Sequence, residues 1–417
     1  MRRKQFSRTI GQLCAVMAVM LLLGSSVGAA TYKTLHVFKG SDGSSPFSGL
    51  TFDTVGNLYG TAPSGGAYGY GVVFKLAPNP KGTWKESVLY NFTGGADGGD
   101  PNSSLIFDSS GNLYGVSGCC GTYGAGNVFE LTPNPDGSWN ETVLYEFTGG
   151  FDGLWPAGPL IFDTTGTLYG TALWGGIGCG VVFKLTPNSD GTWTESVTYS
   201  FNDSPDLCHP QGSLVFDASG NLYGTGYWGG STKCVIHGCG GVFELTPNPD
   251  GSWTESVLHR FSGGWDGANP QGVLTLDTHG NLFGDAVNGT YDQSCGNNRC
   301  GTIFELTPRP DGTWKTHIAH MFTGGSDGGN PDSGPVLDAA GSLYGTAGTG
   351  GRFGYGLVFK LTPKPTRGWK ETVLHVFADH PGAIPQGGVI FDAAGNLYGT
   401  TSGDGATTFG SVYEITP

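Results

Sequence analysis

The chain has few charged residues and lacks the sequence patterns of helical and fibrous repeats. Asp, Glu, Lys and Arg make up 13% of its 417 residues and aromatic residues 12%, which excludes a disordered polyelectrolyte. Apolar residues nowhere recur with a 3.6-residue period, so a helical solenoid is excluded. Glycine does not follow a Gly-X-Y period, which excludes collagen. Neither a His-Glu-x-x-His motif nor a phosphate-binding loop is found.

Positive charge is especially scarce. Against 34 Asp and Glu there are only 20 Lys and Arg, which gives a formal net charge of −14. Four of these basic residues, Arg2, Arg3, Lys4 and Arg8, lie in a segment that we expect to be removed. So acidic a chain is repelled by nucleic acid and by anionic membrane surfaces, and we expect neither as a partner.

Residues 1–30 have the layout of a signal peptide. Arg2–Lys4 form a charged start, Leu13–Leu23 an apolar stretch, and Val27–Ala30 offer small residues for cleavage. The alternative is a membrane anchor, but the apolar stretch is short for a span and no other segment could cross a membrane. We expect a secreted, extracellular protein without membrane insertion after cleavage, with the periplasm as the alternative location. Export also permits disulfides.

Glycine and proline are abundant, at 76 and 24 residues, and they accompany a repeat. The motif Gly-Asn-Leu-Tyr-Gly-Thr or a variant occurs at Gly56–Thr61, Gly111–Val116, Gly166–Thr171, Gly220–Thr225, Gly280–Asp285, Gly341–Thr346 and Gly395–Thr400. Each copy is followed by a variant of Val-Phe-x-Leu-Thr-Pro. In six copies a further segment then runs from a tryptophan to a phenylalanine eight residues later. The chain is therefore built from seven copies of one unit.

Each unit contains four short segments typical of β-strands, which we name A to D in chain order. Strand A precedes an Asp, strand B is Asn-Leu-Tyr-Gly-Thr, strand C is Val-Phe-x-Leu-Thr-Pro, and strand D begins at the tryptophan. Turn residues such as Asp-x-x-Gly-Asn separate them. Seven units of four antiparallel strands predict an all-β, seven-bladed β-propeller that forms a single domain over residues 31–417.

The two ends of the repeat array predict a closed ring. The last unit stops at Pro417, after strand C. The segment Tyr32–Phe38 matches Glu371–Phe377, which is a strand D. The N-terminal strand should therefore complete the seventh blade, which would leave no blade with an open edge.

The repeat motif resembles that of a known family. Gly-Asn-Leu-Tyr-Gly-Thr followed by Gly-x-Val-Phe-x-Leu-Thr-Pro is similar to the tandem repeat of bacterial secreted proteins called choice-of-anchor GloVer-containing proteins, over nearly all of residues 31–417. The resemblance implies no particular activity. More loosely, the order of strand A, turn and strand B is similar to that of NHL and gluconolactonase-like propellers.

Residues that recur in every unit are interpreted as structural. The Asp that ends strand A occurs seven times, and we expect each copy to accept backbone hydrogen bonds in the turn that follows. We expect the tryptophans of strand D to pack between blades. A second Asp, such as Asp97 or Asp152, recurs in the loop from strand D to the next strand A. We expect it to order that loop and predict no cofactor, and a structural calcium ion held by these oxygens is the alternative.

Residues that vary between the units are the candidates for binding. In a propeller the D-to-A and B-to-C loops share the face around the mouth of the central channel, and binding residues often lie on such loops. The variable residues are Asp100, Asn102, Trp155, His209, Gln211, Asn269, Gln271, Asn330, Asp332 and Gln386 in D-to-A loops, with Trp174 and Trp228 in B-to-C loops.

Aromatic faces among amides and carboxylates suit a sugar. We therefore predict a secreted, non-catalytic propeller, a monomer, which binds an extracellular glycan or protein at the mouth. The alternative is an extracellular propeller enzyme, a lactonase, lyase or glycosidase, with its site at the same mouth. In that case His209 could serve as an acid and base together with Asp100 or Asp332.

Eight of the nine cysteines lie beyond residue 30, and all eight are in loops. Two longer units each contain a closely spaced pair, which predicts the disulfides Cys234–Cys239 and Cys295–Cys300. Cys179 and Cys208 belong to neighbouring blades on the same face and are expected to pair. The adjacent Cys119 and Cys120 remain, and we expect them to form a strained vicinal disulfide that their flanking glycines ease.

Overall fold

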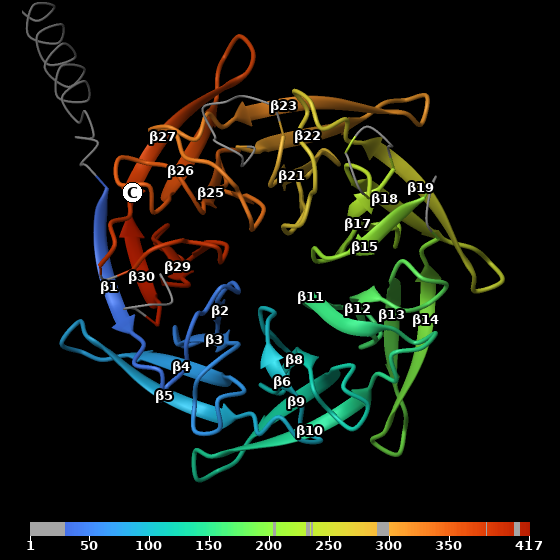
Figure 1. Cartoon of the computed structure of the whole chain (residues 1–417), viewed down its shortest axis with the longest axis vertical. Coiled ribbons are helices and arrows are strands. Elements are labelled where there is room, and N and C mark those ends of the chain that lie inside the picture. Colours follow the sequence, from blue (N-terminus) through green and yellow to red (C-terminus); the bar gives the residue numbers. More distant parts are fainter. Residues whose placement is uncertain are drawn as a thin grey trace, which may run out of the picture.

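The computed structural model describes residues 30–202, 206–230, 234, 237–289, 300–380, 382–403 and 409–417. Among these residues there are strands and turns but no helix, and hence none long and apolar enough to cross a membrane. The strands form seven antiparallel sheets that surround a central axis like blades (Figure 1). The prediction of a seven-bladed β-propeller is confirmed. The expected signal peptide falls almost entirely outside the described residues.

Strands A to D of each blade run in chain order from the centre outward (Figure 1). Blade 1 contains β2 (Thr51–Phe52), β3 (Leu58–Ala62), β4 (Val72–Pro78) and β5 (Trp84–Asn91). Blade 2 contains β7 (Ile106–Phe107), β8 (Leu113–Cys119), β9 (Asn127–Pro133) and β10 (Trp139–Glu146), with the additional β6 (Gly99–Pro101). Blade 3 contains β11 (Leu154–Phe162), β12 (Leu168–Trp174), β13 (Val181–Pro187) and β14 (Trp193–Ser200). Blade 4 contains β16 (Val215–Phe216), β17 (Leu222–Gly229), β18 (Gly241–Pro247) and β19 (Trp253–Arg260), with the additional β15 (Leu207–Pro210).

The remaining blades follow the same plan. Blade 5 contains β20 (Thr275–Leu276), β21 (Leu282–Ala286), β22 (Thr302–Pro308) and β23 (Trp314–Met321). Blade 6 contains β24 (Val336–Leu337), β25 (Leu343–Ala347), β26 (Leu357–Pro363) and β27 (Trp369–Val376). Blade 7 contains β28 (Ile390–Phe391), β29 (Leu397–Thr401), β30 (Ser411–Thr416) and, as its strand D, β1 (Thr31–Val37).

Strand B has a glycine at its centre because a phenylalanine of strand C occupies the space above it. In blade 1, Gly60 pairs with Phe74, and a Cβ on Gly60 would lie 2.6 Å from the Phe74 ring. Gly115 and Phe129 show the same relation in blade 2. The repeated Gly-Thr of strand B therefore reflects close packing within the blade.

The hydrophobic core lies between adjacent blades, and the repeated tryptophans are part of it. One buried cluster combines Val128 of blade 2 with Phe183 of blade 3. Each tryptophan that opens strand D packs against an aromatic residue of the preceding blade, as predicted. The pairs are Trp84 and Tyr398, Trp139 and Tyr59, Trp193 and Tyr114, Trp253 and Tyr169, Trp314 and Tyr223, and Trp369 and Phe283.

The Asp that ends strand A forms the turn to strand B, as predicted. In blade 1, the N–H groups of Val55 and Asn57 donate to Asp53 Oδ1 at 3.0 and 2.8 Å. The same two hydrogen bonds recur at Asp108, Asp163, Asp217, Asp277, Asp338 and Asp392. These carboxylates are therefore structural.

The prediction that the N-terminal strand closes the ring is confirmed. Strand β1 pairs with β30 from Thr31 opposite Thr416 to Val37 opposite Ser411. The Tyr32 ring stacks on His375 of blade 6, with 3.9 Å between ring centroids. The first described strand thus joins the last strand of the chain and also contacts the neighbouring blade.

One backbone hydrogen bond is repeated at every junction between blades. The residue before the proline of each D-to-A loop has a left-handed backbone, with φ between 52° and 59°. Its N–H donates to a carbonyl in the B-to-C loop of the preceding blade. The donor and acceptor residues are Ser45 and Phe409, Asp100 and Tyr70, Trp155 and Ala125, His209 and Cys179, Asn269 and Cys239, Asn330 and Cys300, and Ile384 and Tyr355. These bonds fix the D-to-A loops on the face that we call the mouth.

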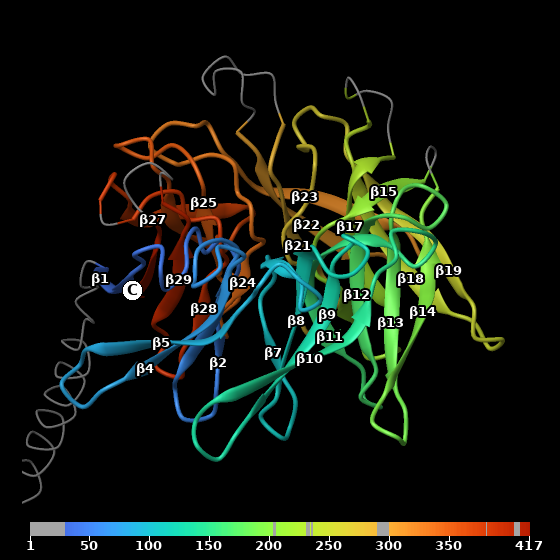
Figure 2. The ribbon, with the colours of Figure 1, turned by 60° about the horizontal axis from the view of Figure 1, so that its bottom comes forward.

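The two faces of the ring carry different loops. The hairpins that join β9 to β10 and β13 to β14 extend from one face, whereas β15 and the loops around it lie on the other (Figure 2). The variable residues of the D-to-A and B-to-C loops therefore gather on the second face, the mouth.

Candidate functional site

Aromatic side chains of blades 3 and 4 gather at the mouth. His209, at the end of β15, lies 3.8 Å from Trp174 and 4.1 Å from Trp228, measured between ring centroids. The ring of His237 stacks on Trp228 at 4.3 Å. We call Trp174, His209, Trp228 and His237 the aromatic cluster. Trp155 is 45% exposed, and its neighbour Leu154 pairs with Trp174 in the sheet.

His209 is held neutral inside this cluster. Its side chain is only 6% exposed, and its Nε2 has no hydrogen-bond partner. Burial, together with the nearby His237, lowers the pKa of His209 to about 4. In the enzyme alternative His209 would act with Asp100 or Asp332, but the rings that lie against the imidazole are those of Trp174 and Trp228, and the titratable group that acts on its pKa is His237.

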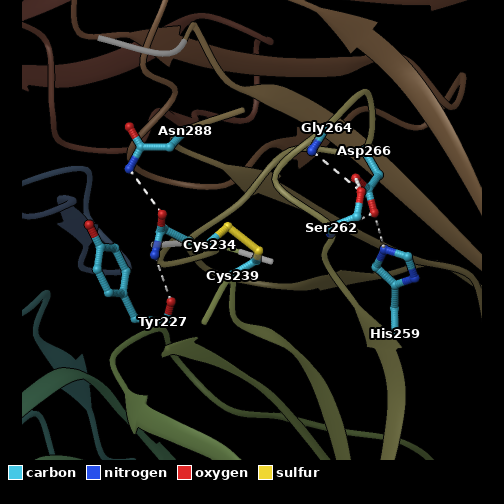
Figure 3. Close-up of a disulfide and its surroundings, with 9 residues drawn as sticks. Tyr227, Cys234, Cys239, His259, Ser262, Gly264, Asp266 and Asn288 are labelled. Carbon is cyan, nitrogen blue, oxygen red and sulfur yellow. Dashed lines mark hydrogen bonds and ion pairs between the residues drawn. A yellow bond between two sulfur atoms is a disulfide. The ribbon is translucent and has the colours of Figure 1, made fainter. Parts of the chain in front are cut away.

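Disulfides hold the loops that carry the aromatic cluster. Cys179–Cys208 links the B-to-C loop of blade 3 to β15, directly before His209, with 4.8 Å between the Cα atoms. Cys234–Cys239 lies in the B-to-C loop of blade 4 (Figure 3). Both predicted bridges are confirmed. Cys300 is disulfide-bonded as well, and its predicted partner, Cys295, lies outside the described residues.

The predicted vicinal disulfide is wrong. Cys119 and Cys120 are both free thiols. Cys119 ends β8 and pairs with Gly99, which keeps its backbone in the extended sheet conformation. The strained eight-membered ring of a vicinal disulfide does not fit that geometry. Burial, with Cys120 as the next cause, raises the pKa of the Cys119 thiol to about 12.

Two of the predicted amides connect blades. Asn269 Nδ2 donates to the Tyr227 carbonyl at 2.9 Å, and Asn288 Nδ2 donates to Asn269 Oδ1 at 3.2 Å; Tyr227 and Asn288 are labelled in Figure 3. Asn330 repeats the first bond, to the Val287 carbonyl at 3.1 Å. Both amides therefore position the loops around the mouth.

Two carboxyl groups meet at another part of the mouth, between blades 5 and 6. Asp285, on β21, is 1% exposed, and burial together with the neighbouring Asp332 raises its pKa well above the usual range. Burial raises the pKa of Asp332 to about 7, against the opposing effect of a hydrogen bond from Gln386. Burial and the Asp332 charge also raise the pKa of Tyr227. We call Asp285 and Asp332 the acid pair.

The sequence analysis did not identify Asp285, although the repeat contains a signal for it. The last residue of the strand B motif is Thr in five blades, Val116 in blade 2 and Asp285 in blade 5. An acidic residue at a position that is otherwise neutral is a departure from the repeat that the sequence alone displays.

The remaining predicted residues lie elsewhere on the mouth. Asp100 and Asn102 belong to blade 2, beside the free cysteines, and burial raises the pKa of Asp100. Asn102 Oδ1 is buried and has no hydrogen-bond partner. Gln211 and Gln271 are partly buried in the loops of blades 4 and 5. The predicted set is therefore divided among blade 2, the aromatic cluster and the acid pair.

The outer edge of the ring offers other groups. His36, Asp42 and Glu86 lie close enough to hold a metal ion, with their ligand atoms within 4.8 Å of one another. A groove of about 670 Å³ lies on the outer strands of blades 5 and 6, where it is lined by Trp265, Lys315 and Arg367 among others. Both features lie on outer strands or the loops beside them, and neither includes a residue of the variable set at the mouth.

The fold and the mouth together define a seven-bladed repeat propeller whose variable residues form an aromatic and an acidic group. A family model described as the Gloeobacter/Verrucomicrobia repeat matches residues 25–234, 134–294 and 235–417. The chain belongs to this repeat family, and the resemblance drawn from its motifs is confirmed. It matches no curated protein.

Proposed function

We propose that the chain is an exported propeller that binds a neutral glycan at the mouth, through the aromatic cluster. The observation that carries this proposal is the packing of His209 between Trp174 and Trp228. Sugar rings stack their C–H faces on aromatic rings, and the side chains of Trp174 and Trp228 are partly exposed.

Charge favours a neutral ligand over an acidic one. The formal net charge is −14, and the mouth itself contains Asp100 and Asp332. A polyanionic glycan would be repelled both at long range and at the site. The disulfides that brace the aromatic cluster suit an oxidising compartment, which supports export.

Titration with neutral hexasaccharides of glucose, xylose, mannose and N-acetylglucosamine tests this function. At least one of them should bind and change the tryptophan fluorescence. Trp174→Ala and Trp228→Ala should weaken binding by about tenfold or more, because aromatic residues at the centre of a site carry much of the binding energy. Trp265→Ala is the control, since it removes an exposed tryptophan from the outer edge. The proposal fails if no glycan binds, or if all three variants bind equally well.

Acid–base chemistry at the same mouth is a second candidate function. The acid pair favours it, because two carboxyl groups with raised pKa values can supply a general acid and a general base. An enzyme of this kind would release new reducing ends or open a lactone. Asp332→Asn should abolish that turnover, whereas turnover that survives in this variant would remove the acid pair from the reaction.

A further inference from the structure

Two departures from the repeat meet at a single junction between blades. The first is Asp285, at a strand B position that is Thr in five blades. The second is Asp332, directly after the loop proline, where blades 4, 5 and 7 have Gln211, Gln271 and Gln386. Both changes replace a neutral hydrogen-bonding residue by an acid, and both fall at the junction of blades 5 and 6.

Asp285 occupies a place where several other blades have a hydrogen-bond donor. In three other blades the equivalent Thr hydroxyl donates to a backbone carbonyl of the following blade. The donor and acceptor residues are Thr61 and Ser103, Thr346 and Gly387, and Thr400 and Ser48, at 2.9, 3.4 and 3.0 Å. A carboxyl group can replace that donor only while it keeps its proton.

The immediate surroundings of Asp285 include the backbone of Gly272 and Gly334. A Cβ placed on Gly272 would lie 2.0 Å from Asp285 Oδ1, and the N–H groups of Gly272 and Gly334 are close by. Neither carboxyl oxygen makes a hydrogen bond of normal geometry. The nearby backbone N–H groups favour the ionised form, but burial and the charge of Asp332 outweigh them and raise the pKa of Asp285. The group is thus a buried acid with unused hydrogen-bonding capacity, on which Asp332 acts.

Asp332 stands in front of Asp285 at the mouth and is partly exposed. The side chain of Gln386 donates a hydrogen bond to it from blade 7, and Tyr227 faces it from β17. Gly348 leaves room for it, since a Cβ there would lie 3.0 Å from Asp332 Oδ2. Among the described residues, no lysine, arginine or histidine acts on the pKa of either carboxyl group.

We propose that Asp332 is the hydroxyl-binding carboxylate of the mouth, and that Asp285 is a permanently protonated acid behind it, so that the acid pair carries a single negative charge. A carboxylate is a strong acceptor for a sugar hydroxyl. Two adjacent negative charges would repel each other, and the retained proton prevents this. The role of Asp332 rests on the proposed glycan binding, whereas the proton on Asp285 does not.

The affinity for the tightest-binding neutral hexasaccharide should depend on pH. Burial raises the pKa of Asp332 to about 7, so its ionised fraction grows roughly tenfold between about pH 6 and pH 8. The affinity should rise by roughly the same factor, because the ionised form is the better acceptor. The pKa of His209 is lowered to about 4, so His209 does not titrate in this range.

Two variants that restore the residues of other blades test the assignment. Asp332→Gln should bind with an affinity that no longer changes between pH 6 and 8. Asp285→Thr should keep the pH dependence and lose one protonated carboxyl band in the infrared spectrum at pH 8. Glu141→Gln is the matched control, because it removes a carboxyl with a pKa raised to about 7 from a distant junction; its pH profile of binding should equal that of the wild type.

Each half of the proposal can fail by itself. The role of Asp332 is overturned if the affinity of the wild type stays constant from pH 6 to 8. It is also overturned if the pH dependence persists in Asp332→Gln. Identical infrared spectra of the wild type and Asp285→Thr at pH 8 would overturn the buried proton. If no hexasaccharide binds, the proposed function fails and the role of Asp332 fails with it, while the infrared measurement still decides the state of Asp285.

Discussion

Residues that precede the loop prolines show how a fixed backbone displays variable side chains. All seven have a positive φ, yet none is glycine, and their side chains range from Ser45 to Trp155. A left-handed backbone costs a non-glycine residue roughly 1–3 kcal/mol, and surrounding structure must maintain it. Here the hydrogen bond from each N–H to the preceding blade supplies part of that support.

Ile384 is the least favourable residue at these positions, because β-branched side chains rarely adopt a positive φ. Ile384→Asn should stabilise the protein by about 1 kcal/mol, since asparagine tolerates this backbone. Its amide could also donate to the Gly348 carbonyl, as Asn269 does to Tyr227. Thermal unfolding should show a midpoint about 1 °C higher. Ile384→Val is the control and should give no gain; an equal gain in both variants would contradict the argument.

At the residue scale, repetition separated structural residues from variable ones. The turn-forming Asp53 and the packing of Trp139 could be predicted because the same residue occurs in every unit or in most of them. The environment of His209 could not, because Trp174 and Trp228 approach it from two different blades and the sequence contains no distance between them. The free thiols of Cys119 and Cys120 likewise depend on the pairing of β8 with Gly99.

At the scale of elements, the outer strands of neighbouring blades meet through acidic groups. In blade 1, Tyr90 Oη donates to Asp97 Oδ2 at 3.1 Å, and Glu141 of the next blade approaches the same carboxylate. Burial and the facing Asp raise the pKa of Glu86, Glu141 and Glu195 to about 7, and that of Glu255 to about 8. One carboxyl oxygen of each Glu is buried and has no hydrogen-bond partner.

The stability of the ring should therefore fall as the solution becomes more alkaline. A carboxyl with a raised pKa in the folded state binds more protons there than in the unfolded chain, so its contribution is complete below its usual pKa and is lost as pH rises through 7 to 8. The melting temperature should decrease from pH 6 to pH 9, and Glu195→Gln should reduce that decrease. Glu146→Gln, at the end of β10, is the control. A wild-type melting temperature that rises over this range would contradict the prediction.

The four strands of each unit were predictable because turn residues separate them, but their lengths were not. Strand A has only two residues in six blades, whereas β11 extends over Leu154–Phe162. The difference arises because Leu154 and Pro156 of the D-to-A loop also pair with β12 in blade 3. Such pairing depends on how the loop lies over the sheet, which a repeat pattern does not specify.

At the scale of the whole molecule, seven equivalent blades are closed by a strand from the other end of the chain. The number of blades and this closure followed from the count of repeats and from the match of Tyr32–Phe38 to a strand D. The acid pair did not follow, because it forms only when the ring places blade 5 beside blade 6 with a fixed rotation.

Deletion of residues 31–38 should destabilise the ring strongly. It would expose the edge of β30 and remove the stacking of Tyr32 on His375 and the buried Phe38. We expect the melting temperature to fall by roughly 5–10 °C or more. A circular permutant in which these residues follow Pro417, through the hairpin sequence Asn134–Trp139, should recover most of the loss. An unchanged melting temperature in the deletion variant would contradict the closure argument.

The pairing of β1 with β30 also sets an order of events during synthesis. The strand that leaves the ribosome first finds its partner only after the last residues have emerged, because β30 ends at Thr416. Until then blade 7 has no outer strand, and the molecule is an open arc with an unprotected edge. The ring can therefore close only once β30 has been made, and the mouth takes its final form at that moment.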